Sequence, residues 1–169
     1  NDLCPGSNGS NVDSNGCALN QKDTDGDGVT DDLDICENTS SSSEIVNSSG
    51  CKVDLFFLDE NGITIKAIDE AEPGMIDTIN GKQYIIVDNQ TLREYIQEYN
   101  TTPYVPDFMV TSKVTDMSYL LKEKSLFNTT GLRNWDVSNV ENFEGMFQGS
   151  KPYIAQYVDT RLFLDTWDT

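Results

Sequence analysis

The sequence predicts a mixed fold with three successive parts along its 169 residues. Residues 1–52 are expected to be irregular and held by calcium and disulfides, because an aspartate-rich loop lies among four cysteines and apolar residues are too sparse there to form a core. Residues 53–109 combine β-branched and aromatic runs with a helical periodicity, which indicates a small β-plus-α unit. Residues 110–169 contain an internal repeat, which predicts a solenoid.

The aspartate-rich loop runs from Asp23 to Asp34. Counted from Asp23, carboxylates fall at positions 1, 3, 5, 9 and 12, and Gly28 stands at position 6. This is the ligand order of a 12-residue calcium loop, in which the carbonyl of position 7 also binds the ion and glycine permits a sharp turn. A solvated acidic linker would not keep this register. The predicted calcium ligands are Asp23, Asp25, Asp27, Val29 (through its carbonyl), Asp31 and Asp34.

The residues that flank this loop distinguish between the protein families in which such a calcium loop occurs. A helix-loop-helix calcium hand has Glu at position 12 and amphipathic helices on both sides, whereas this chain has Asp34 and no helical periodicity there. The pattern DxDxDGxxDxxDxC resembles the thrombospondin type 3 repeat, a family in which calcium and disulfides replace a hydrophobic core. A dockerin-type loop, the alternative, needs a following apolar helix, and ENTSSSSE is not one.

The four cysteines occur in two copies of one pattern. DLC and NGC contain Cys4 and Cys17, and DIC and SGC contain Cys36 and Cys51. Local bridges within each copy are the simplest pairing, although four cysteines allow three connectivities. Cysteines beside an acidic calcium loop indicate an oxidising, calcium-rich location, so we expect an extracellular or cell-surface protein.

The composition excludes several classes of function. A formal net charge of −18 and a pI near 4.1 argue against binding nucleic acid or an anionic membrane, which needs clusters of Lys and Arg. No apolar run approaches the ~18 residues of a membrane span, so we expect no membrane insertion within this chain. The sequence has no histidine, which removes Ser-His-Asp and Cys-His catalysis and the commonest zinc ligand.

The middle part alternates strand and turn signals before a helix. The expected strands share β-branched and aromatic residues and cover 53–58, 63–68 and 83–87. Turn signals at 59–62 and 80–81 separate them. A helix capped by Asp88 or Asn89 should follow. Its apolar face, at helical spacing, consists of Leu92, Tyr95, Ile96 and Tyr99.

The last part repeats itself with a period of 26 residues. The residues Val114, Met117 and Leu121 realign with Val140, Phe143 and Phe147. The stretch VTDMSYLL…FNTTGLRNWDVSNVENFEGMF resembles the 26-residue surface-protein repeat of BspA-like bacterial proteins. That resemblance implies a leucine-rich-repeat-like solenoid over 110–169, with the β-plus-α unit as its cap. Because the repeats break off at both ends of the chain, we expect a piece of a longer surface protein.

Aromatic and sulfur-containing side chains recur through these repeats. They could stack on sugars, but their solenoid spacing favours a place in the core. These residues are Met117, Phe127, Trp135, Phe143 and Phe147.

Together these features predict a non-catalytic extracellular protein. A calcium-stiffened stalk would carry a repeat domain that adheres to a protein or glycan on a host or neighbouring cell, or that self-associates. Two alternatives remain open: a structural subunit of an extracellular filament, and an accessory region of a secreted hydrolase. No catalytic residue is predicted.

Overall fold

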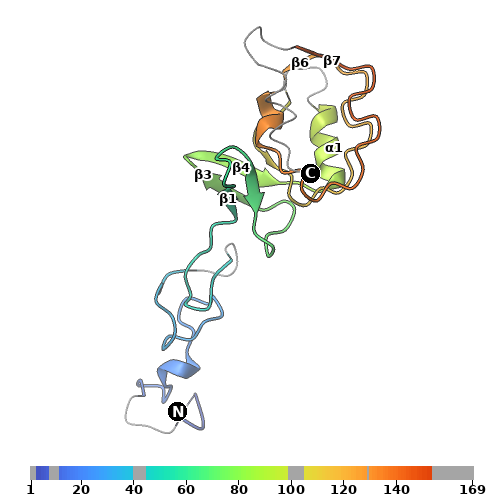
Figure 1. The fold of residues 1–169 in the computed structure, drawn as a ribbon. Helices are drawn as coiled ribbons and strands as arrows, with labels where there is room; N and C mark the ends of the chain where they lie inside the picture. Colours follow the sequence, from blue (N-terminus) through green and yellow to red (C-terminus); the bar gives the residue numbers. More distant parts are fainter. Residues whose placement is uncertain (1–2, 8–11, 40–44, 99–104, 129, 154–169) are drawn as a thin grey trace. The chain divides into compact units, whose positions relative to one another are not determined.

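The computed structural model describes residues 3–7, 12–39, 45–98, 105–128 and 130–153. The chain divides into two compact units, Asn1–Asp54 and Leu55–Thr169. We describe each unit by itself (Figure 1). Within the described ranges, no helix combines the length and the apolar character needed to cross a membrane.

The first unit consists of loops closed by two local disulfides. Cys4 is bonded to Cys17 and Cys36 to Cys51, at sequence separations of 13 and 15. The local pairing is therefore confirmed, and no cysteine is free. On chain-entropy arguments each bridge of this length contributes ~3 kcal/mol to stability. Regular structure among the described residues of this unit is limited to isolated bridges and the 3-10 helix η1 (Leu19–Gln21).

The two disulfide loops are built alike. In the first, Asp13 Oδ1 accepts hydrogen bonds from the backbone N–H groups of Asn15 (2.9 Å) and Cys17 (3.0 Å). In the second, Asn47 Oδ1 accepts them from Ser49 (2.9 Å) and Cys51 (3.2 Å). Since Asp and Asn side chains cap such turns equally well, both copies adopt the same turn despite the difference in charge.

The second unit contains three small sheets. The hairpin of β1 (Phe56–Leu58) and β2 (Ile65–Ala67) is antiparallel. In the second sheet, β3 (Ile76–Ile79) pairs antiparallel with β4 (Lys82–Ile86), which pairs in parallel with β5 (Met109–Val110). The third pairs β6 (Ser125–Asn128) in parallel with β7 (Lys151–Tyr153). The sequence prediction missed β3, whose turn with β4 is Asn80-Gly81, both residues having positive φ.

Helix α1 (Asn89–Glu98) crosses from β4 to β5 and carries Leu92 and Ile96 into the core. Asp88 caps it: its Oδ1 accepts the N–H groups of Gln90 (3.1 Å) and Thr91 (2.8 Å). These hydrogen bonds hold the pKa of Asp88 below its usual range, and the one from the Thr91 N–H contributes most. The cap satisfies N–H groups that the first helical turn leaves without partners.

Two segments of the last third lie side by side in parallel, 26 residues apart in sequence. Asp116 forms a parallel bridge with Asn142, and the N–H groups of Met117, Tyr119, Leu121 and Glu123 donate to carbonyls of the second segment. In Figure 1 the two segments run as paired traces beside α1. The helix is joined to the first segment, because Asn89 Oδ1 accepts the N–H groups of Thr115 (2.8 Å) and Asp116 (3.0 Å).

A buried polar network explains the WDVS sequence. Asp136 is buried; its Oδ2 accepts the Ser112 hydroxyl at 2.7 Å and its Oδ1 accepts the Ser138 hydroxyl at 2.7 Å. The Ser112 oxygen in turn accepts the N–H of Ala67 in β2 at 2.9 Å. Since the buried Ser112 hydroxyl and Asp136 carboxylate are both hydrogen-bonded, the network fastens the β1–β2 hairpin to the repeat region.

The predicted leucine-rich-repeat-like solenoid is wrong. The described residues form a small β-rich unit with short sheets, one α-helix and a single pair of stacked segments, rather than an array of successive coils. A solenoid needs about three repeats before stacked neighbours bury a continuous core, and residues 154–169, the last part of the expected repeat region, lie outside the described residues. The expected boundary between 109 and 110 falls within one core, which includes Met109 and Val114.

The prediction that the aromatic and sulfur-containing side chains of the repeats lie in the core is correct for part of that set. Met117 and Trp135 are buried, whereas Phe143 and Phe147 are each 38% exposed. The side chain of Phe127 lies outside the described part of the structure. Periodicity therefore identified equivalent positions, but equivalence in sequence did not give equal burial.

Candidate metal centre

The calcium-type loop is folded around its first aspartate. Asp23 Oδ1 accepts the N–H groups of Gly26 (2.8 Å) and Asp27 (3.2 Å), and Oδ2 accepts that of Gly28 (2.9 Å). Gly26 and Gly28 have φ values of 79° and 94°, which residues with a Cβ rarely adopt. The glycines thus allow the chain to turn back so that the following carboxylates face Asp23.

Three carboxylates converge in this turn. Asp23, Asp25 and Asp27 each place one oxygen within 4.8 Å of the oxygens of the other two. Three negative charges at this separation repel each other by about 1 kcal/mol per pair even in bulk water, and by more near a protein surface. The arrangement therefore favours a bound cation, which would reverse the sign of this interaction.

Asp27 gives independent evidence for a ligand. The residue is 4% exposed. Its Oδ1 accepts the N–H of Val29 at 2.7 Å, but its Oδ2 is buried and has no hydrogen-bond partner. A buried carboxylate oxygen without a partner is costly, and acidic residues of a solvated loop are not buried in this way. An ion bound by Oδ2 removes that cost, since oxygen atoms are the ligands that Ca²⁺ prefers.

Asp34 and Gly50 form the opposite side of this centre. Asp34 Oδ1 accepts the N–H of Cys36 at 2.8 Å. A Cβ at Gly50 would lie 2.0 Å from Asp34 Oδ1 and 2.9 Å from Asp27 Oδ2. Both carboxylate oxygens therefore lie against the bare backbone of Gly50. Gly50 was not among the predicted site residues, although its place in the SGC copy of the cysteine pattern was a usable signal.

The second disulfide loop holds Gly50 there. Ile35 N–H donates to the carbonyl of Ser49 at 2.9 Å, and Cys51, next to Gly50, is bonded to Cys36. A second unpredicted contact comes from Thr39, whose N–H donates to Asp25 Oδ2 at 2.8 Å. The centre is therefore assembled from the aspartate loop and from the disulfide loop that follows it.

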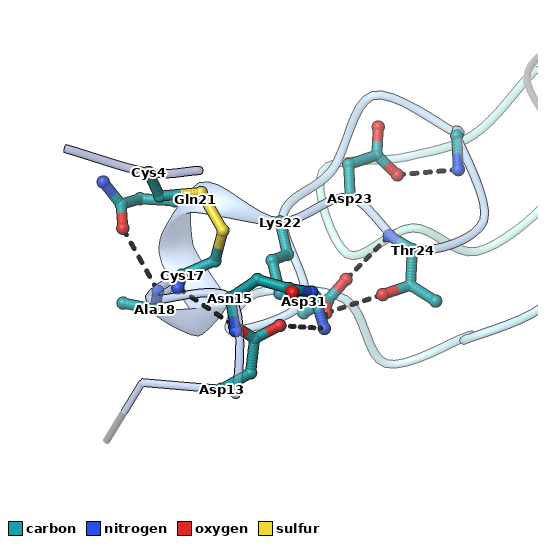
Figure 2. Close-up of polar contacts among 11 residues, drawn as sticks. Cys4, Asp13, Asn15, Cys17, Ala18, Gln21, Lys22, Asp23, Thr24 and Asp31 are labelled. Atoms are coloured by element: carbon teal, nitrogen blue, oxygen red, sulfur yellow. Dashed lines mark hydrogen bonds and ion pairs between the residues drawn. A yellow bond between two sulfur atoms is a disulfide. The ribbon is translucent and has the colours of Figure 1, made fainter. Parts of the chain in front are cut away.

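Asp31 is not one of the three carboxylates that converge in the turn; Figure 2 shows it beside Thr24 and Lys22. Its two oxygens accept the N–H and the hydroxyl of Thr24, each at 2.8 Å, and Lys22 Nζ lies 3.6 Å from Oδ2. The pKa of Asp31 lies below its usual range. The hydrogen bond from the Thr24 hydroxyl is the largest cause, and the positive charge of Lys22 contributes less. These contacts join position 31 to the start of the loop.

Val29 contributes its N–H to Asp27 in this conformation, and its carbonyl stays a predicted ligand. Lys22 also lies 3.7 Å from Asp13 Oδ2, so it connects the first disulfide loop to the aspartate loop. The hydrogen bond from Cys17 N–H is the main cause of the lowered pKa of Asp13. Lys22 thus supplies a positive charge between two carboxylates outside the cluster.

Comparison with known proteins bears on the second unit. Residues 91–169 match a protein family described as "Mycoplasma protein of unknown function, DUF285". This match is compatible with a BspA-like repeat in that part of the chain. No curated protein and no solved structure matches the chain.

Proposed function

We propose that residues 1–54 bind calcium as a spacer similar to thrombospondin type 3 repeats, within a non-catalytic protein of the cell surface. The observation that carries the proposal is the buried, unpartnered Oδ2 of Asp27 beside the carboxylates of Asp23 and Asp25. Asp34, the Asp31 carboxylate and the Val29 carbonyl are further ligands from the sequence register. Calcium suits this set because it accepts many oxygen ligands in flexible geometry, whereas Mg²⁺ demands a near-ideal octahedron.

The ion would be structural. Among the described residues of the first unit, the one buried hydrophobic side chain is Cys17, which is part of a disulfide. Several of its large apolar residues are instead exposed: Leu3, Val12, Leu19, Leu33 and Ile35. Without an apolar core, the ion and the two disulfides must supply the order of this unit.

An extracellular location fits both stabilising elements. Disulfides persist in oxidising compartments, and loops of this type in extracellular modules bind calcium with Kd of about 10⁻⁴–10⁻³ M. The second unit would then make the contact with a protein or glycan of another cell. Its exposed aromatic side chains support that role: Tyr119, Phe143 and Phe147 are each 38–42% exposed.

Calorimetric titration with calcium tests the metal site. Asp27→Asn should weaken binding at least about tenfold, because the substituted amide keeps the shape but removes the charge of the buried ligand. Asp13→Asn is the matched control, since Asn47 already fills the equivalent place in the second loop. Equal calcium binding by Asp27→Asn and the unmodified protein would refute the site.

Limited proteolysis tests the spacer role. Chelation of calcium should raise cleavage within residues 23–34 and leave the second unit largely resistant, because the hydrophobic core of that unit does not involve the ion. Unfolding of the second unit on chelation would contradict the proposal. The non-catalytic assignment would be contradicted if the protein hydrolysed glycans or peptides and the substitution of one carboxylate abolished that activity.

A further inference from the structure

The second unit contains a hollow of about 480 Å³ that the calcium proposal does not use. It is lined by the β1–β2 and β3–β4 hairpins, by Asp107 before β5, and by the end of the 3-10 helix η3 (Thr130–Asn134). Figure 1 shows β1, β3 and β4 grouped together in this unit. The volume is in the range of small-molecule sites.

The walls of the hollow are joined to one another. Lys82 of β4 forms an ion pair with Asp107 at 2.6 Å and donates to the Asp107 carbonyl at 2.9 Å. On the other side, η3 packs against the same segment through Gly131, where a Cβ would lie 2.3 Å from the Val105 carbonyl oxygen. Only glycine permits this close approach of η3 to the Val105 carbonyl. Arg133, two residues after Gly131, lines the hollow. The hollow is therefore largely preformed, which limits the ordering cost of binding.

The charges that line the hollow favour an anion. The carboxylate of Asp107 neutralises Lys82. Arg133 is exposed, and within the described residues it makes no hydrogen bond or ion pair. An unpaired guanidinium beside a hollow is unexpected on a chain with a net charge of −18. Its planar fork of donors matches a carboxylate.

The apolar part of the lining is aliphatic. Leu58, Ile63, Ile65 and Ile79 contribute to it. The aromatic ring in the lining, that of Tyr84, is already occupied, because Lys82 Nζ lies 5.0 Å above its centroid and Phe56 meets it edge-on. Tyr84 is 7% exposed, so a sugar ring would find little aromatic surface to stack on here, whereas an aliphatic chain would bury apolar surface.

We propose that this hollow binds a carboxylate that carries an aliphatic group, with the carboxylate on Arg133 and the aliphatic group against the isoleucines. Such a group is present in a short-chain fatty acid and at the carboxyl terminus of a peptide that ends in an aliphatic residue. This site is independent of calcium, and it assigns a ligand class to the unit for which we proposed a binding role.

Calorimetry with two probes tests the assignment and separates the sources: hexanoate, and an acetylated tripeptide that ends in leucine with a free carboxylate. At least one should bind, whereas hexanol and the peptide amide should bind at least about tenfold more weakly. Arg133→Gln should weaken the binding by a similar factor. Lys122→Gln removes the same charge from an exposed site elsewhere in the unit and should have no effect.

A second variant tests the aliphatic wall. Leu58 is 40% exposed, so Leu58→Ser should leave the fold intact and weaken binding of the carboxylate that binds. Thermal unfolding of each variant checks its fold. Failure of both carboxylates to bind, or equal binding of the uncharged probes, overturns the proposal. Unchanged binding of the carboxylate by the Arg133→Gln variant also overturns the proposal.

Discussion

Met117 and Phe143 occupy equivalent places in two stacked segments, but Met117 is fully buried whereas Phe143 is 38% exposed. Leu121 and Phe147, at 1% and 38%, show the same difference. The first segment lies between α1 and the second segment, as its hydrogen bonds to Asn89 and Asn142 show. The structure describes no segment stacked beyond the second one. Equivalent places in the repeat therefore differ in burial between the two segments.

This difference predicts unequal effects of truncation. Met117→Ala should reduce the free energy of unfolding by ~2–5 kcal/mol, because it opens a cavity in a closed core. Phe143→Ala should cost about 1 kcal/mol, since a large part of the ring is already in water. Urea unfolding followed by tryptophan fluorescence measures both, because both tryptophans lie in the second unit. Equal losses would show that Phe143 is covered in solution.

Gly50 should be required for calcium binding. In Gly50→Ala the new methyl group would collide with the carboxylates of Asp34 and Asp27, and the positive φ of 74° adds strain. We expect calcium affinity to fall at least about tenfold in a calorimetric titration. Gly6→Ala is the control, because Gly6 also has positive φ but open space around it. Unchanged affinity in Gly50→Ala would mean that the disulfide loop does not close the centre.

The two disulfides should differ in their effect on the ion. Replacing Cys36 and Cys51 with serine frees the loop that holds Gly50 against the carboxylates, so calcium affinity should fall at least about tenfold. Replacing Cys4 and Cys17 should lower the stability of the first loop and change calcium affinity much less. The comparison of the two double variants by calorimetry decides this, and equal losses would contradict it.

Asp88 should make part of the stability of the second unit depend on pH. Its lowered pKa means that its charge adds stability that is complete above the unfolded value, about 3.8, and is lost as the pH falls through the folded pKa. Asp88→Ala should cost ~1 kcal/mol at pH 7. Asp88→Asn, which keeps the acceptor oxygen, should cost less, and its difference from the unmodified protein should disappear at acid pH. Urea unfolding at several pH values measures this, and a difference that persists in acid would refute the charge effect.

Local sequence patterns were sufficient for features that depend on neighbouring residues. The duplicated framing of the cysteines pointed to the pairs that form, because short loops close most readily. The helix cap at Asp88 and the turn at Asn80-Gly81 follow from local hydrogen bonds and positive φ. The 26-residue offset between Val114 and Val140 likewise gave the register of the stacked segments.

Which residues share a site or a core depends on contacts between segments that are far apart in sequence. Gly50 lies against Asp27 and Asp34 because a disulfide loop folds back over the aspartate loop, and Asp31 binds Thr24 instead of joining the cluster. The repeat pattern indicated an array of coils, but whether Phe143 is buried depends on what lies beyond its segment. The periodicities and the local turns could be predicted from the amino-acid sequence, since these are set by residues a few positions apart. The folded chain decided burial and ligand placement, since these depend on segments far apart in sequence.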